Sequence, residues 1–296
     1  MADAAATEQV RRFNRTVTQR VGALSDSFLA LDRPLAEARL LWEIGEEGCE
    51  VRALRNRLGL DSGHASRLLR ALEAAGLVRV EPSRSDRRVR VAALTRAGRA
   101  QRALLDARSD ELAASMLAPL DAPQRERLVE SMRTVERLLT LGAIEIRRVE
   151  PAHPDARECF RAYFEELGRR SETGFDPTVS SLVAPHELTP PAGCLLIAYL
   201  HAQPVGCGAV RHHPSGEASE IKRLWVSPSV RGLGLGHRLL EELEALVAES
   251  GAPAARLDTH GALVEAISLY RSAGYREIAP FNDEPFADHW FEKRLG

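Results

Sequence analysis

Apolar residues recur every three or four positions along much of the first half of the chain, which is the spacing of amphipathic helices. This pattern predicts helices over residues 5–31, 35–46, 51–58, 62–75 and 95–117, and a last helix that ends near Leu141. Two short runs between the fourth and fifth helices alternate apolar and polar residues instead. These runs, Leu77–Glu81 and Val89–Leu94, predict two strands joined by a hairpin tip at Pro82–Asp86.

A short helix, a turn, a second helix and a two-stranded hairpin in this order predict a winged helix-turn-helix. Its recognition helix would be 62–75, because residues at about 100° per position separate into two faces there. The apolar face holds Ala65, Leu68, Leu69, Leu72 and Ala75. The opposite face and the hairpin tip offer polar groups to a DNA groove and its backbone. The predicted DNA-binding residues are Ser62, Gly63, His64, Ser66, Arg67, Arg70, Arg84, Asp86, Arg87 and Arg88.

The second half mixes strands and helices and predicts an α+β fold with a mixed central sheet. The chain should therefore form two domains, a mainly α domain over 1–142 and an α+β domain over 143–296. The elements expected in the second domain are strands 144–149, 194–201, 204–211, 219–226 and 255–259, helices 155–170, 236–250 and 264–273, and terminal strands.

Composition supports a globular protein, since hydrophobic residues make up 44% and charged residues 28% of the 296 positions. The net charge of −2 hides a basic segment, because residues 51–96 contain eleven arginines and four acidic residues. Such a patch is typical of a polyanion-binding surface, although a solvated arginine-rich face would have the same composition.

Several classes of protein are not expected. The N-terminus lacks the apolar centre of a secretory signal, and the weakly charged stretch 190–210 contains too many Pro and Gly residues for a membrane helix. The four cysteines form no CxxC pair and have no histidine at zinc-ligand spacing. We therefore expect a cytoplasmic protein with reduced thiols, no metal and no membrane partner.

Residues 8–140 resemble the MarR family of regulators. The resemblance is carried by Ser66-Arg67-Leu68-Leu69, Gly76-Leu77-Val78, Ser85-Asp86-Arg87-Arg88 and Leu94-Thr95-x-x-Gly98. It implies binding to a pseudo-palindromic operator DNA by a homodimer whose interface uses the first and last helices, 5–31 and 98–141. Packing of these helices into the core of a monomer is the alternative.

The densest motif of the second half is a glycine loop, in which the strand ending at Val226 leads to Gly232, Gly234 and Gly236 before a helix begins. Backbone N–H groups of such a loop and the helix N-terminus can hold a pyrophosphate. The spacing fits neither the GxGxxG dinucleotide motif nor a P-loop, which needs Gly-Lys-Ser/Thr.

Arg231-x-x-Gly234-x-Gly236 instead resembles the acetyl-CoA loop of the GNAT superfamily of N-acetyltransferases. Glu220–Val226 before it and Leu257-Asp258-Thr259 and Ala266-x-x-Leu269-Tyr270-x-x-x-Gly274-Tyr275 after it support the resemblance over residues 145–295. One position departs from the family, since many members have Asn where this chain has Leu263. The resemblance implies acetyl-CoA as cosubstrate, bound by Leu224, Trp225, Val226, Arg231, Gly232, Leu233, Gly234, Leu235, Gly236, His237, Arg238 and Tyr270.

By the same resemblance, the Val226 N–H polarises the thioester carbonyl and Tyr270 is the general acid. A packed core aromatic is the alternative for Tyr270. Glu220 is the candidate general base, or else an ion-pair partner of Lys222 or Arg223. His260 is a second candidate. The acceptor amine is not identified, and its pocket is expected along 163–189, which carries Glu165, Glu166, Glu172 and Asp176.

Three functions fit these features. The first is a DNA-binding transcriptional regulator that is also an active acetyltransferase. The second is a regulator whose GNAT-like half only senses acetyl-CoA or an amine. The third is an enzyme that uses the winged helix only for dimerisation. Arg67, Arg70 and the wing arginines argue against this third function.

Overall fold

A computed structural model describes residues 3–22, 29, 33–83, 86–171, 183–213 and 216–295. It divides into two compact units, Met1–Met132 and Arg133–Gly296, and the division falls within helix α6 (Ala122–Gly142). The domain boundary expected from the sequence, after residue 142, lies at the end of the same helix and stays a prediction. No helix in the described part of the chain is both long and apolar enough to span a lipid bilayer.

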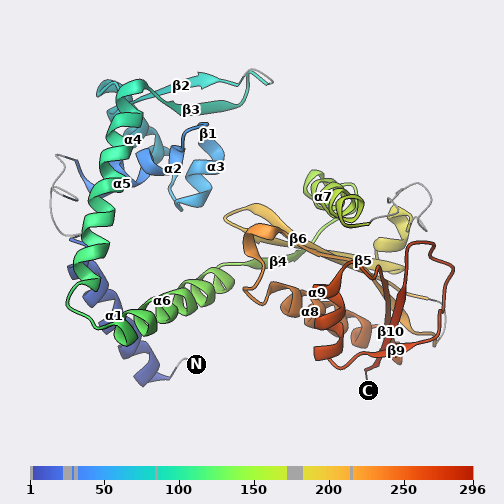
Figure 1. Ribbon diagram of the computed structural model, residues 1–296. Coiled ribbons are helices and arrows are strands. Elements are labelled where there is room, and N and C mark those ends of the chain that lie inside the picture. Colours follow the sequence, from blue (N-terminus) through green and yellow to red (C-terminus); the bar gives the residue numbers. More distant parts are fainter. Residues whose placement is uncertain are drawn as a thin grey trace. The chain divides into compact units, whose positions relative to one another are not determined.

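The N-terminal unit is the predicted winged helix-turn-helix (Figure 1). Its core lies between α2, α4 and the sheet, around Leu40, Leu41 and Leu72. The three-stranded antiparallel sheet has the order β1-β3-β2, and β1 is a two-residue strand that the sequence pattern does not show. The elements are α1 (Ala4–Arg20), α2 (Leu35–Ile44), β1 (Cys49–Glu50), α3 (Val51–Arg57), α4 (Ser62–Ala74), β2 (Val78–Pro82), β3 (Arg90–Leu94) and α5 (Arg96–Leu117).

Helix α1 ends at Arg20, earlier than the expected 5–31 segment, whose residues 23–28, 30 and 31 lie outside the described part.

The start of α5 explains the Leu94-Thr95-x-x-Gly98 motif. The Thr95 hydroxyl accepts a hydrogen bond from the Gly98 N–H at 3.0 Å and donates one to the Gly76 carbonyl at 2.7 Å. A Cβ on Gly98 would lie 2.0 Å from the Leu77 carbonyl oxygen, so only glycine fits there.

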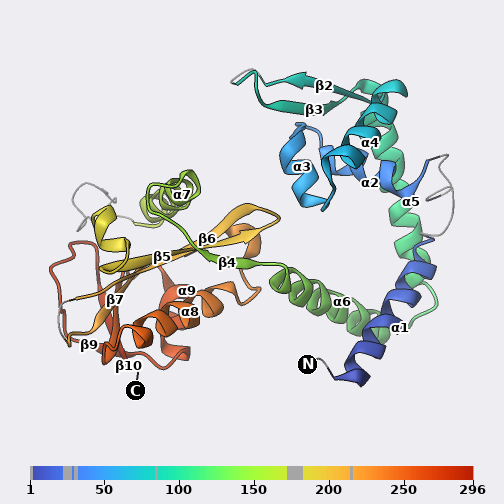
Figure 2. The ribbon, with the colours of Figure 1, turned by 180° about the vertical axis from the view of Figure 1, so that it is seen from behind.

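The C-terminal unit is an α+β fold around a seven-stranded sheet of order β4-β5-β6-β7-β8-β10-β9. Its strand pairs are antiparallel except β7–β8. Helix α7 covers one face of the sheet, and α8 and α9 cover the other (Figures 1 and 2). The elements are β4 (Glu145–Arg148), α7 (Pro154–Arg170), β5 (Gly193–Leu200), β6 (Gln203–Arg211), β7 (Ser219–Val226), α8 (Leu235–Glu249), β8 (Ala254–Thr259), α9 (Val264–Ser272), β9 (Arg276–Ile278) and β10 (His289–Arg294).

Candidate functional site

The two parallel strands of the large sheet, β7 and β8, pair over a short stretch and then separate. Their pairing covers Ser219↔Ala255 and Glu220↔Arg256, whereas β7 continues to Val226. The Ser227 N–H donates to the Val205 carbonyl at 2.8 Å, on the β6 side. Because successive N–H groups of an extended chain point to opposite edges, the Val226 N–H points toward the side that β8 has left. A backbone donor thus faces the gap between the strands.

The loop after β7 brings further backbone donors to the same place. Gly232 and Gly234 have φ angles of +74° and +93°, a region that favours glycine. Gly234 is the N-cap of α8, and no side chain caps this helix. The first N–H groups of α8 are therefore available to an anion.

A cavity of about 450 Å³ opens at this loop, bounded by β7, α7, α8 and α9. Ten of the twelve residues predicted to bind the cofactor line it: Leu224, Trp225, Val226, Arg231, Gly232, Gly234, Leu235, Gly236, His237 and Tyr270. Leu233 instead packs against the core on the α8 side. The Arg238 guanidinium donates to the Leu141 and Ile144 carbonyls at 3.2 and 2.9 Å. The cavity and the loop together fit an elongated ligand with a pyrophosphate group.

Tyr270 lies in the wall of this cavity and is 5% exposed. Its ring lies 5.8 Å from Phe291 and 6.0 Å from Tyr275, so packing fixes its position. Burial raises the pKa of the phenol well above its usual value. The hydroxyl therefore stays protonated at neutral pH, as a proton donor must.

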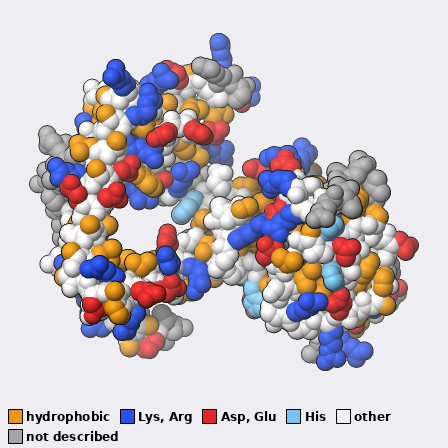
Figure 3. All heavy atoms as spheres, in the orientation of Figure 1, with side chains coloured by type: hydrophobic (Ala, Val, Ile, Leu, Met, Phe, Trp, Pro, Cys, Tyr) orange, Lys and Arg blue, Asp and Glu red, His pale blue; other side chains and the backbone are white. Residues whose placement is uncertain are grey.

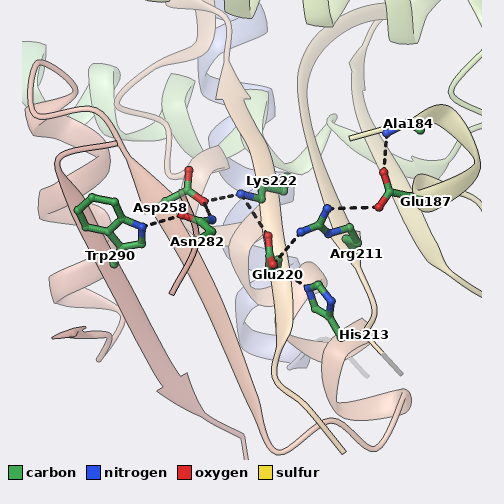
Figure 4. A network of polar contacts seen from close by, with 9 residues as sticks. All are labelled: Ala184, Glu187, Arg211, His213, Glu220, Lys222, Asp258, Asn282 and Trp290. Carbon is green, nitrogen blue, oxygen red and sulfur yellow. Dashed lines mark hydrogen bonds and ion pairs between the residues drawn. The ribbon is translucent and has the colours of Figure 1, made fainter. Parts of the chain in front are cut away.

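Glu220, the candidate base, is not among the described residues that line the cavity. One carboxylate oxygen accepts from Arg211 at 2.8 Å and contacts His213 at 2.7 Å, and Lys222 lies 3.2 Å from the other (Figure 4). Burial raises the pKa of Glu220, but the charges of Lys222 and Arg211 lower it by more. Lys222 is also paired with Asp258. These contacts support the alternative interpretation, in which Glu220 is an ion-pair partner. Lys222 is one of the predicted partners, and Arg211 takes the place of Arg223.

His260, the second candidate base, is also absent from the described lining of the cavity. Its Nδ1 accepts a hydrogen bond from the Ala262 N–H at 3.0 Å and lies 3.7 Å from the Asp288 carboxylate. Leu263, where the chain departs from the family pattern, does line the cavity. Glu172 and Asp176 lie outside the described residues.

The sequence did not predict the contacts of Glu166. It indicated only that this carboxylate, with others along 163–189, could line the pocket of the acceptor amine. Glu166 is 7% exposed, accepts from the Trp225 indole at 2.9 Å and pairs with Arg231. Arg170 lies 3.0 Å from the same carboxylate and also binds Glu265 of α9. Burial raises the pKa of Glu166, and hydrogen bonds from Arg231 and Trp225 lower it by more. Glu166 therefore joins α7 to the end of β7 and to the glycine loop.

The second candidate site is the exposed face of α4. The Asp61 carboxylate caps this helix by accepting from the His64 N–H at 2.9 Å. Ala65, Leu69 and Leu72 are buried, as predicted, whereas Ala75 is exposed at the end of the helix. The predicted DNA-binding residues Ser62, Gly63, Ser66, Arg67 and Arg70 are exposed, and His64 is half-buried.

The wing adds cations, since Arg87 and Arg88 are exposed and Arg side chains gather over β2 and β3 (Figure 3). The Asp86 carboxylate accepts from the Arg88 N–H at 2.9 Å and so shapes the turn. Arg84 lies outside the described residues.

Comparisons with known proteins match each half of the chain to a protein family. Residues 150–275 match the acetyltransferase (GNAT) family, and residues 31–89 match the MarR family. An IAA acetyltransferase from Azospirillum brasilense is 33% identical over 117 residues, which are 40% of this chain and 76% of that protein. An uncharacterized N-acetyltransferase from Schizosaccharomyces pombe is 33% identical over 135 residues, 44% of this chain and 80% of that protein.

Among solved structures, a GNAT-family acetyltransferase from Staphylococcus aureus Mu50 covers 52% of this chain and 100% of its own, with 19% identity and a TM-score of 0.45. The fold and the family matches define a two-domain protein, a winged helix-turn-helix joined to an acyltransferase fold. The chain belongs to the GNAT acetyltransferase family, whose members use acetyl-CoA, and it carries a MarR-family DNA-binding domain at its N-terminal end.

Proposed function

We propose that this protein is both a transcriptional regulator that binds operator DNA and an enzyme that acetylates an amine. The observation that carries the enzymatic half is the convergence of three features on one cavity. These are the Val226 N–H, the uncapped N-terminus of α8, and the protonated Tyr270.

Acetyl-CoA, when bound, supplies the acetyl group as a thioester. In our proposal the backbone of residues 231–236 binds its pyrophosphate, and the open edge of β7 from Leu224 to Val226 pairs with its pantetheine arm. The Val226 N–H donates to the carbonyl oxygen and stabilises the negative charge that develops there. The Tyr270 hydroxyl donates its proton to the departing thiolate sulfur.

For the DNA-binding half, we propose a homodimer formed through α1, α5 and α6. Neither α1 nor α6 has a buried residue among those described, which is unusual for long amphipathic helices. Several of their apolar side chains are 40–67% exposed and are available to a second copy. The exposed residues are Val10, Phe13 and Val17 on α1 and Met132, Leu138 and Leu139 on α6. Such a dimer would place two α4 helices on a pseudo-palindromic operator.

The contacts of Glu220 favour a second candidate function, a regulator whose GNAT domain senses acetyl-CoA with weak or no turnover. A carboxylate held by Arg211 and Lys222 has a lowered pKa and is a poor base. In the enzymatic proposal Glu220 accepts the amine proton, directly or through water.

One experiment separates the two functions. CoA release from acetyl-CoA is measured with a panel of amines, beside operator binding by the same preparation. We expect amine-dependent CoA release together with sequence-specific DNA binding. Acetyl-CoA binding and operator binding without CoA release for any amine would support the sensor instead.

A further inference from the structure

A β-bulge turns one arginine toward the α7 face of the sheet. Ile221 and Leu224 both pack into the core on the α8 side, although residues three apart on a regular strand face opposite sides. The extra residue is Arg223, which has a φ of +55°, and the pairing of β7 with β6 shifts register at this point. A bulge of this kind re-aims a side chain, and a non-glycine residue at positive φ costs backbone energy.

The bulge places the Arg223 guanidinium against aromatic rings of α7. It lies 4.3 Å from the centroid of the Phe160 ring and 5.5 Å from that of Phe164. One of its nitrogens donates to the Val183 carbonyl at 3.3 Å. Burial lowers the pKa of this guanidinium. No carboxylate among the described residues pairs with it.

Three other cations near this face have acidic partners. Arg170 pairs with Glu166 and Glu265, and Arg231 pairs with Glu166. Lys222 pairs with Glu220 and Asp258. Arg223 is therefore a cation that the described side chains leave without a counter-charge, and a partly buried arginine of this kind favours an anionic ligand.

Arg223 is not among the described residues that line the candidate cavity, but it is adjacent to that cavity, because the next residue in the chain, Leu224, does line it. Tyr163 lines that cavity, and its phenol is within electrostatic range of Tyr270, Asp258 and Arg223. An acceptor whose amine approaches Tyr270 could thus place a second group at Arg223. One unmatched positive charge suits a monoanion better than a doubly charged phosphate or phosphonate.

We propose that Arg223 binds a carboxylate on the acceptor, so that the substrate class is amines that carry a carboxylate, such as amino acids. This inference rests on the proposed acetyltransferase activity. The planar guanidinium would bind the carboxylate through two parallel hydrogen bonds.

The test compares kcat/KM for matched acceptors, the standard amino acids and their carboxamides, with the phosphonate analogues of the same amines as a third arm. The wild-type protein should prefer the carboxylates. Arg223→Met should reduce that preference roughly 10- to 100-fold, the effect of losing a hydrogen bond to a charged group. Arg223→Lys should retain part of it, and Arg157→Met, on the exposed surface of α7, should retain all of it. The dissociation constant for acetyl-CoA should stay unchanged and reports on folding.

Turnover of carboxamides or phosphonates as good as that of the carboxylates would overturn the inference, whether or not Arg223→Met folds. A carboxylate preference that survives in a folded Arg223→Met would do the same, and both results leave the acetyltransferase proposal standing. Acetyl-CoA binding without turnover of any amine, these pairs included, would instead refute the enzymatic proposal and this inference with it.

Discussion

A single phenol carries the chemistry proposed for the cavity. Tyr270 is buried, fixed between Phe291 and Tyr275, and kept protonated by its surroundings. Its role is separable from cofactor binding, because the backbone of the glycine loop holds the pyrophosphate in our account.

Tyr270→Phe should therefore lower kcat roughly 100-fold, the order of a lost general acid, and leave the dissociation constant for acetyl-CoA unchanged. Steady-state CoA release and calorimetric titration measure the two quantities. Tyr275→Phe is the matched control, since Tyr275 packs 6.0 Å from Tyr270 but is not among the cavity-lining residues. An unchanged kcat in Tyr270→Phe would remove it from the general-acid role.

Residues differ in how far the sequence predicts their roles. Tyr270 and Gly234 stand in short motifs that resemble those of a known family, and this resemblance singled them out. Glu166 contacts Trp225 and Arg231 across 59 and 65 positions of the chain, and no local pattern marks such a pair. The turn of Arg223 likewise depends on its pairing with β6, because β7 reads as a regular strand by itself.

At the scale of elements, the loop before α8 depends on glycine for its backbone conformation. Gly234 has a φ of +93° and lines the cavity, whereas Gly251, just beyond the other end of α8, has a φ of +78° and does not. A non-glycine residue at either position would have an unfavourable left-handed backbone conformation, but we expect only the substitution at Gly234 to block the ligand.

Gly234→Val should abolish acetyl-CoA binding. Gly251→Val should lower the melting temperature to a similar degree and still bind acetyl-CoA. Calorimetry for binding and thermal unfolding for stability check the pair. Equal loss of binding in both variants would show that strain, and not blocked access, explains the effect.

Another prediction concerns DNA binding by the exposed face of α4. Arg67→Ala should weaken operator binding by roughly 1–3 kcal/mol and relax base preference, because Arg67 is expected to contact base edges. Arg88→Ala, on the wing, should weaken binding to operator and mutated operators by similar factors. Fluorescence anisotropy with both DNA classes measures this. Sequence-independent binding by the wild-type protein would contradict the assignment of α4.

Patterning predicted the order of helices and strands in both units, since most have one buried face. The two-residue strand β1 is too short for any alternation to be visible. The separation of β7 from β8 also needed the structure, because strand pairing is a property of the whole sheet and not of either strand.

For the whole molecule, α6 is the element that joins the two proposed activities. The division between the compact units falls inside it, and its last residues contact the glycine loop and the first turn of α8. The Arg238 side chain, in the first turn of α8, donates to the Leu141 carbonyl, and a Leu141 methyl carbon lies 3.8 Å from where a Gly234 Cβ would be. A ligand that orders this loop should therefore act on the end of α6, a helix that we also place in the dimer interface.

The central claim is that one chain binds operator DNA and acetyl-CoA and couples the two. The most direct measurement is the operator dissociation constant at zero and at saturating acetyl-CoA. Typical coupling free energies of about 1–3 kcal/mol predict a change of roughly 5- to 150-fold, and operator DNA must change the affinity for acetyl-CoA by the same factor. Identical operator dissociation constants in both conditions would contradict the account, because they would mean two independent modules on one chain.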